Sequence, residues 1–491
     1  MNELSTKQAY SLSTKVKRWL SMGIIICIGL ICYFSLQPAG LNVFAWRTVV
    51  IFVVTIICIM CQVLPIGALG IIAVTMYALT YSGGAKTASE SISDALSAMN
   101  NSLIWLIVVA FMIARGFIKT GLGQRVALLL VKMLGTHTLG LAYGLALADL
   151  ILAPAMPSNT ARCGGVIYPV ADSLSRSFNS LPDNDSRRKI GSFLVYCIGA
   201  VNDVTSTLFL TGFTANLLAM KLAALQGVSL SWIGWFTAMS IPCLLSFAIT
   251  PFVIYMLVSP EIKKTPEASL VAAEKLKNMG KMTVHEWVMI GTMLLLLVLW
   301  IVGASINVDQ TTTAFIGLSV LLLTGVLTWD DVKNEKGAWD TLIWFSALLM
   351  LASQLSKLGF TGWFGSLVES NISHLDNTNW VFILIILSVF YCYLHYFFAS
   401  GNAVVAALYT IFLGVGAHLG VPVLPMALML TCCTNISCSL TQYTHARGPI
   451  LFGAGYVPIG VWWRTGFIMS VINLIIFFVS GLLWWKILAL Y

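Results

Sequence analysis

The sequence predicts an all-α polytopic membrane protein with about eleven transmembrane helices, two re-entrant hairpins and two inverted repeats. Hydrophobic residues make up 58% of its 491 residues and charged residues only 9%, whereas a soluble domain carries about 25% charged residues. The mean hydropathy is +0.90. Apolar runs close to the length of about 20 residues that spans a bilayer recur along the chain. This composition excludes a large soluble helical protein.

The transmembrane helices are expected where these apolar runs occur. They lie near residues 21–36, 46–62, 65–82, 102–120, 190–225, 232–258, 285–303, 312–328, 341–357, 403–420 and 463–489. Two further apolar stretches, about 139–170 and about 378–400, contain polar interruptions and predict re-entrant hairpins. The polar segment 259–283 divides the chain into a first half, 21–258, and a second half, 284–491.

The distribution of basic residues predicts the topology. Lysine and arginine are concentrated in the N-terminal segment 1–20 and in the linker 259–283, and are absent from residues 37–45, 226–231 and 304–311. The positive-inside rule therefore places the N-terminus and the linker in the cytoplasm. The net charge of +8 reflects this bias and indicates no nucleic-acid partner. Without a cleavable signal or a transit peptide, the sequence favours a bacterial inner membrane.

The eleven cysteines lie in apolar segments, where free cysteine behaves as a small hydrophobic residue. The Cys58-x-x-Cys61 spacing has no second ligand pair that would complete a metal site. The sequence also has no His/Glu metal spacing and no nucleophile with a base beside it. We therefore expect neither an enzyme nor a cofactor.

A compact polar cluster interrupts the first hairpin stretch. It comprises Pro157, Ser158, Asn159, Thr160, Ala161 and Arg162. A charge at the bilayer centre costs from ~3 to 10 or more kcal/mol. Such clusters persist where non-helical backbone lines a protected cavity, and there they mark a solute site. The cluster predicts a transporter of small anions.

The same order of motifs occurs in both halves of the chain. In the first half, Leu-Ile-Trp, Lys-x-Gly, a hairpin cluster and a broken-helix cluster occupy residues 103–105, 119–121, 158–160 and 202–216. In the second half they occupy residues 342–344, 357–359, 400–402 and 434–449. With the predicted topology, the two repeats run in opposite directions. Inverted repeats with interrupted segments indicate a secondary transporter that binds its substrate near the midplane.

A carboxylate away from water needs oriented hydrogen-bond donors. Half-helix N-termini supply backbone N–H groups, and Ser, Thr and Asn side chains add others. Ser158, Asn159 and Thr160 suit one tip, and Ser400 and Asn402 suit the other.

Four charged side chains near these clusters leave alternatives open. Arg162 and Arg447 bind a carboxylate through planar, charge-assisted bonds, pair with Asp149 or Asp203, or extend to a membrane interface. His445 donates to an anion, carries a proton or is simply packed. Asp203 either pairs with an arginine or holds a cation.

At these residues the sequence resembles the divalent anion:sodium symporter superfamily, and within it bacterial citrate/succinate and tartrate/succinate antiporters and plastid 2-oxoglutarate/malate translocators. The resemblance is carried by residues 104–106, 119–125, 152–162, 440–443 and 453–456. It implies a scaffold domain and a transport domain that moves as an elevator, in a homodimer. Carried over to this chain, the substrate-binding residues are Ser158, Asn159, Thr160, Asn216, Ser400, Gly401 and Asn402. Thr441, His445 and Arg447 lie where relatives carry a different late broken-helix sequence, and we add them as candidates.

The expected function is secondary transport of di- or tricarboxylates such as succinate, malate, fumarate, tartrate, citrate or 2-oxoglutarate. If Arg162 and Arg447 offset the substrate charge, an empty carrier would hold uncompensated arginines, so we expect obligate exchange. The alternative is Na⁺-coupled symport with a cation at Ser158, Asn159 and Asp203. A channel is disfavoured by the repeats. Expected partners are carboxylates, membrane lipid and a second copy of the chain.

Overall fold

The computed structural model describes residues 23–35, 37–61, 63–182, 184–360, 362–363 and 379–491, and these fold into helices as predicted. Within them, nine helices are long and apolar enough to cross a membrane. They are Val43–Met60, Ser102–Thr120, Thr138–Ala155, Trp232–Leu257, Val284–Val302, Lys336–Lys357, Trp380–Phe397, Gly401–His418 and Ile459–Ile487. The count of about eleven and the cytoplasmic segment 1–20 stay predictions, since part of the chain, that segment included, lies outside the described residues.

The first half begins with the helix Gly23–Phe34. It continues with α2 Val43–Met60, α3 Ile66–Leu79, α4 Ala88–Leu96, α5 Ser102–Thr120, α6 Leu122–Leu134, α7 Thr138–Leu152, α8 Tyr168–Ser177, α9 Gly191–Leu208, α10 Thr214–Ala224 and α11 Trp232–Leu257. The linker contains α12 Pro266–Met279. The second half contains α13 Val284–Val302, α14 Gln310–Leu323, α15 Trp329–Lys333, α16 Lys336–Lys357, α18 Trp380–Leu394, α19 Gly401–Val404, α20 Thr410–His418, α21 Val423–Ile436, α22 Gly448–Gly453, α23 Ile459–Ile476 and α24 Leu482–Ile487.

Three elements differ from the predicted spans. The span 190–225 is two helices, because extended residues Phe209 and Phe213 flank a short turn between α9 and α10. The stretch 378–400, whose first residue lies outside the described part, supplies only the outgoing arm α18, and the chain returns through 401–418. Helices α6, α12 and α21 have no counterpart among the predicted spans, because α6 and α12 are too polar and α21 ends in the polar residues Thr431, Thr434 and Asn435.

The Lys-x-Gly motif that occurs in both halves ends a long helix each time. Gly121 follows α5 with φ +75, and Gly359 follows α16 with φ +86. A left-handed conformation at this position suits glycine, which has no Cβ to clash. The two motifs are therefore helix stops.

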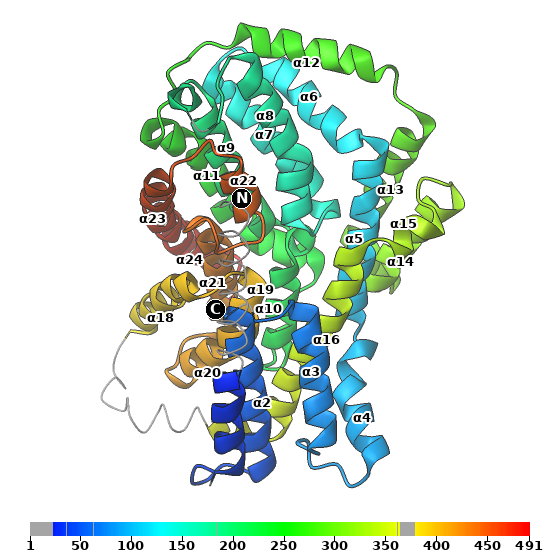
Figure 1. The fold of residues 1–491 in the computed structure, drawn as a ribbon, viewed down its shortest axis with the longest axis vertical. Helices are drawn as coiled ribbons and strands as arrows, with labels where there is room; N and C mark the ends of the chain where they lie inside the picture. Colours follow the sequence, from blue (N-terminus) through cyan, green and yellow to red (C-terminus); the bar gives the residue numbers. More distant parts are fainter. Residues whose placement is uncertain (1–22, 36, 62, 183, 361, 364–378) are drawn as a thin grey trace, which may run out of the picture.

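The helices gather toward the two ends of the long axis of the molecule. α2, α3 and α4 lie at one end, where α16 packs on α2, α3 and α5, whereas α12 crosses the opposite end (Figure 1). Near that end, α9 packs against α7, α8 and α11, and α6 packs against α7 and α12. The elements next to the polar clusters meet in the interior, where α21 packs against α9 and α10, and α10 packs against α19.

The linker is packed rather than free. The backbone N–H of Thr265 donates to Thr136 O at 2.9 Å, and that of Thr138 donates to Lys263 O at 3.1 Å. Arg125 of α6 donates through Nε to Glu286 Oε1 of α13 at 2.5 Å and through Nη1 to Gly280 O at 2.9 Å. These bonds tie α6, α7 and α13 to the linker.

Two ion pairs, one at the end of α5 and one at the start of α6, allow the contribution of the buried bond between α6 and α13 to be compared with that of an exposed bond. The side chains of Arg125 and Glu286 are 8% and 1% exposed, whereas those of Lys119 and Asp331 are 37% and 16% exposed. We expect Arg125→Ala to destabilise the protein by about 3 kcal/mol, because the Glu286 carboxylate stays buried without its partner. Lys119→Ala is expected to cost at most about 1 kcal/mol. Thermal unfolding of the purified protein measures both; equal shifts would contradict the assignment.

Candidate functional site

The first hairpin turns at the polar cluster 157–162. α7 ends at Leu152, a short turn containing Pro154 follows, and the return arm begins with the π-helix Ala161–Ile167 before α8. Ser158 Oγ accepts a hydrogen bond from the backbone N–H of Ala161 at 3.2 Å and so caps the start of the return arm. Asn159 is buried, while Ser158 and Thr160 are half-buried.

The second hairpin has the same succession of local structures. After α18 come a turn of 3-10 helix, His395–Phe397, and an extended tip; the return arm then contains α19, the π-helix Val405–Tyr409 and α20. A Cβ at Gly401 would lie 3.1 Å from the ring of Phe213 and 3.3 Å from Cys438 Sγ. Asn402 Oδ1 accepts from Thr214 Oγ1 at 3.0 Å. The tip of hairpin 2 therefore rests on the break between α9 and α10.

The breaks that follow α9 and α21 are joined through two asparagines. Asn216 Nδ2 donates to Ser206 O at 2.8 Å and to Phe209 O at 3.1 Å, across the first break. Asn435 Nδ2 donates to Asn216 Oδ1 at 2.8 Å. Asn216 thus satisfies unpaired backbone carbonyls where α9 ends and connects them to α21.

Arg162 is fully buried in a cage of oxygen atoms. Its Nε donates to Asp149 Oδ1 at 3.1 Å, and Nη2 donates to Ser206 Oγ at 2.7 Å. Nη1 donates to Met156 O at 2.6 Å and to Gly212 O at 3.1 Å. The guanidinium therefore links hairpin 1 to the first break, and it adopts the ion-paired alternative to a substrate-facing position.

Arg447 lies in a second cage that also contains an aspartate. Its Nη2 donates to Asp203 Oδ1 and, at 3.1 Å, to Ser439 Oγ, while Nη1 donates to Asn202 Oδ1 at 2.8 Å. Ser439 Oγ donates to Asp203 Oδ2 at 2.5 Å. Both oxygens of Asp203 therefore have partners, and the pair joins α9 to the second break.

Asn202 connects the two cages. Its Nδ2 donates to both oxygens of Asp149 at 3.0 Å, while its Oδ1 accepts from Arg447. Thr205 Oγ1 also donates to Asp149. Two arginines and two aspartates thus form one buried network in which each positive charge has a negative partner. Breaking either pair would leave a buried charge uncompensated.

The two histidines near the second break are both buried and bonded. His445 Nδ1 accepts from the backbone N–H of Arg447 at 3.1 Å, and its ring lies 5.3 Å from that of Phe213. His395 contacts Thr444 O at 3.0 Å and Ser437 Oγ. Thr441 is also buried, and its Oγ1 accepts from the N–H of Tyr443 at 3.4 Å. These contacts shape the second break.

A cavity of about 470 Å³ lies beside the tip of hairpin 2. Ser400, Ala403 and Ala446 line it on one side, and the turn between α2 and α3, including Pro65 and Ile66, lines it on the other. Small-molecule sites have volumes of about 300–1,000 Å³. The cavity is therefore large enough for a small carboxylate beside the tip and the second break.

The sequence singled out the clusters and gave Asp149 and Asp203 as one alternative for the arginines, but it missed the other contacts of the network. Asn202, Ser206, Ser439 and Asn435 all lie in polar clusters that the sequence singled out, but spacing alone assigned none of their contacts. The shared order of motifs in the two halves predicts that the polar clusters lie close together. It does not predict which side chain contacts which. No group of three or more His, Cys, Asp or Glu side chains placed to hold a metal occurs among the described residues.

Comparison with known proteins identifies similar transporters. The family described as the sodium:sulfate symporter transmembrane region matches residues 16–491. The Bacillus subtilis protein named "Putative malate transporter YflS" is 49% identical over 95% of this chain and 96% of its own length. The spinach chloroplast dicarboxylate transporter 2 is 44% identical over 95% and 82%. The L-tartrate/succinate antiporter of Escherichia coli is 35% identical over 97% and 99%.

A solved structure supports the fold at lower similarity. The Neisseria gonorrhoeae efflux pump MtrF is 13% identical, and the match covers 88% of this chain and 97% of that one with a TM-score of 0.57. At this identity the likeness shows a shared transporter fold alone.

Proposed function

The chain belongs to the family described as the sodium:sulfate symporter transmembrane region, and we propose that it is a secondary transporter that exchanges di- or tricarboxylates. As predicted, it is a multi-pass membrane transporter and not an enzyme. The names of the relatives support dicarboxylates as substrates. We further propose a bacterial inner membrane and a homodimer.

The arrangement of fixed charges is the observation that carries this proposal. The guanidinium of Arg162 contacts carbonyl, hydroxyl and carboxylate oxygens, and that of Arg447 contacts hydroxyl, amide and carboxylate oxygens. Oxygens of these kinds are also the ligands that hard cations prefer. We propose that Arg162 and Arg447 occupy the positions that coupling cations would take in a Na⁺-coupled carrier, with Asp149 and Asp203 as their counter-ions. This supports transport that does not require Na⁺.

Asp149 and Asp203 remove one physical reason for obligate exchange. The expectation of obligate exchange assumed that the arginines have no counter-ion in the empty carrier, but each arginine has an aspartate partner, which is the alternative that the sequence left open. Net charge in the empty network therefore gives no reason for obligate exchange. Exchange is supported instead by the antiporter among the relatives.

We propose that the substrate binds in the cavity beside the tip of hairpin 2. Its carboxylates would take hydrogen bonds from Ser400, which lines the cavity. The adjacent half-buried side chain of Asn402 and the first backbone N–H groups of the return arm, which begins at Gly401, would be further donors. Ser158, Asn159 and Thr160 would provide the corresponding donors at hairpin 1. An elevator-type movement of the hairpins past α2, α3 and α16 would expose the site alternately.

Uptake of labelled succinate into proteoliposomes of the purified protein tests the function. We expect uptake to need unlabelled succinate inside the vesicles and to be unchanged by an inward Na⁺ gradient. Vesicles without protein give the background. Uptake into vesicles without internal substrate, driven by Na⁺, would instead establish symport, which the family's description as a sodium:sulfate symporter favours. Absence of any carboxylate flux would contradict the substrate class.

A further inference from the structure

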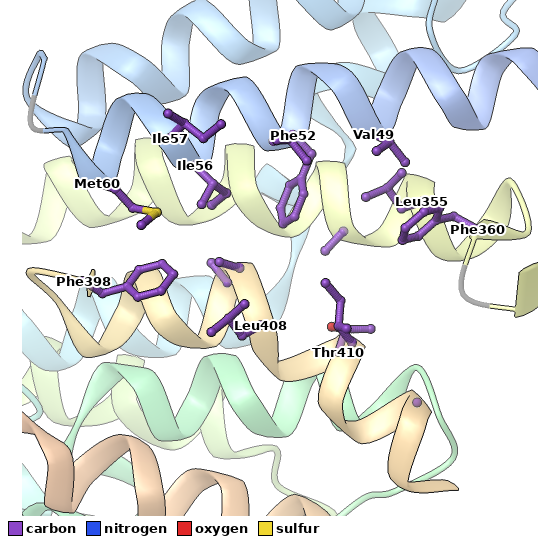
Figure 2. Close-up of a pocket in the computed structure, with 16 residues that line it drawn as sticks. Val49, Phe52, Ile56, Ile57, Met60, Leu355, Phe360, Phe398, Leu408 and Thr410 are labelled. Carbon is purple, nitrogen blue, oxygen red and sulfur yellow. The ribbon is translucent and has the colours of Figure 1, made fainter. Parts of the chain in front are cut away.

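An apolar cavity of about 280 Å³ lies between α2, the end of α16 and the return arm of hairpin 2 (Figure 2). Phe52 and Ile56 of α2 face Leu408 of the return arm across it. Thr410 carries the one polar side chain among the described residues that line it. Apolar cavities of about 150 Å³ already stay dry and hold small hydrocarbons. Water is therefore a poor occupant of this larger space.

One wall of the cavity reaches the apolar outer surface of α2. Val53 and Ile57 line it, and 44% and 38% of their surfaces are exposed. They belong to α2, a helix apolar and long enough to span the membrane. The hydrocarbon of the surrounding lipid is thus the material that can enter from this side, and a chain that fills the void gains dispersion contacts that an empty cavity lacks.

One end of the apolar cavity continues into a polar one. A neighbouring cavity of about 260 Å³ shares Thr410 and Gly414 with it and is also lined by Gln226, Ser356 and His418. Thr410 Oγ1 is buried at this junction and has no hydrogen-bond partner among the described residues. A buried hydroxyl without a partner is costly, so the occupant should bring an acceptor to this point.

We propose that these two cavities form a binding site for one membrane phospholipid. An acyl chain fills the apolar cavity, the ester groups take a hydrogen bond from Thr410 Oγ1, and the polar part lies against Gln226, Ser356 and His418. No lysine or arginine is among the described residues that line either cavity. The polar end therefore suits neutral ester groups better than the free carboxylate of a fatty acid.

If the proposed transport function holds, the lipid lies between two parts of the protein that move past each other. The site lies between hairpin 2 and the pair α2 and α16, the two parts that an elevator movement would displace relative to each other. At its other end, the apolar cavity shares Met60 and Phe398 with the cavity beside Ser400. An exchangeable lipid chain here would let hairpin 2 slide past α2 and α16 next to the substrate site.

Native mass spectrometry of the delipidated protein, titrated with 1-palmitoyl-2-oleoyl phosphatidylcholine, tests the binding itself. A Cβ at Gly414 would lie 3.6 Å from Gln226 Nε2, so Gly414→Leu fits the backbone and directs its bulk into the junction of the cavities. We expect the fraction of protein carrying one retained lipid to fall by at least about fivefold, because the added side chain occupies space that the lipid needs.

Gly460→Leu is the matched control, because the same side chain is added to α23 where nothing lies within 4 Å. It should retain lipid as the unmodified protein does. Leu408→Trp fills the same cavity from another position. Lipid binding can therefore still be tested if one of the two filling variants fails to fold. Equal lipid retention in both filling variants and the control overturns the proposal, as does retention of oleic acid in preference to the phospholipid. Because the readout is binding, it is independent of the transported substrate.

Discussion

Arg162→Ala is expected to abolish carboxylate exchange and to destabilise the protein. The guanidinium makes four hydrogen bonds that join hairpin 1 to the break between α9 and α10. Its removal leaves the buried Asp149 carboxylate without its ion-pair partner, which costs about 3–5 kcal/mol. Exchange in proteoliposomes should fall by at least about 100-fold, because the guanidinium no longer links hairpin 1 to the break between α9 and α10. A factor of 100 corresponds to about 2.8 kcal/mol, at 1.4 kcal/mol per factor of ten.

The double variant Asp149→Asn with Arg162→Gln separates stability from transport. It removes both charges together, so the cost of an uncompensated carboxylate disappears and thermal unfolding should return toward that of the unmodified protein. The shorter glutamine cannot reach Met156 O, Gly212 O and Ser206 Oγ together, so exchange should stay lost. A double variant that is stable and fully active would show that Arg162 only maintains the fold.

Arg447→Ser is expected to make transport depend on Na⁺. The substitution leaves Asn202 Oδ1, Ser439 Oγ and the Asp203 carboxylate around the space that the guanidinium filled. In choline medium the unpaired carboxylate should reduce exchange by at least about 100-fold. Added Na⁺, bound by the same oxygens, should restore part of the rate.

The unmodified protein and Arg447→Met are the controls for this rescue. Exchange by the unmodified protein should be the same in Na⁺ and in choline medium. Methionine keeps most of the volume of the side chain and leaves no room for a cation, so Arg447→Met should stay inactive in both media. If Arg447→Ser is equally active, or equally inactive, in both media, Arg447 does not act in place of a cation.

The sequence predicts the location of the polar elements better than their partners. Residues 139–170 are recognisable as a hairpin because a charge inside an apolar stretch is tolerated mainly where the backbone turns beside a protected cavity. The return arm 401–418 is predicted as a separate span, because its length and hydropathy match those of an ordinary transmembrane helix. Only packing against α10 and α21 distinguishes it.

The pairing of the arginines shows why the site is harder to predict than the fold. Arg162 follows the tip of hairpin 1 directly, so the sequence favours contact with substrate. The structure instead directs its guanidinium to Asp149 on the outgoing arm of the same hairpin. A periodic pattern reports which face of a helix is buried, but it cannot report which of several nearby acceptors a long side chain reaches.

The ion pair between Asp203 and Arg447 also constrains how the chain is assembled. Arg447 is synthesised 244 residues after its partner, which at ~5–20 residues per second is a delay of about 10–50 s. Throughout that interval Asp203 is already in the nascent membrane protein without its arginine. The first half therefore cannot complete its packing before the second half is inserted, and the two halves finish folding as one unit.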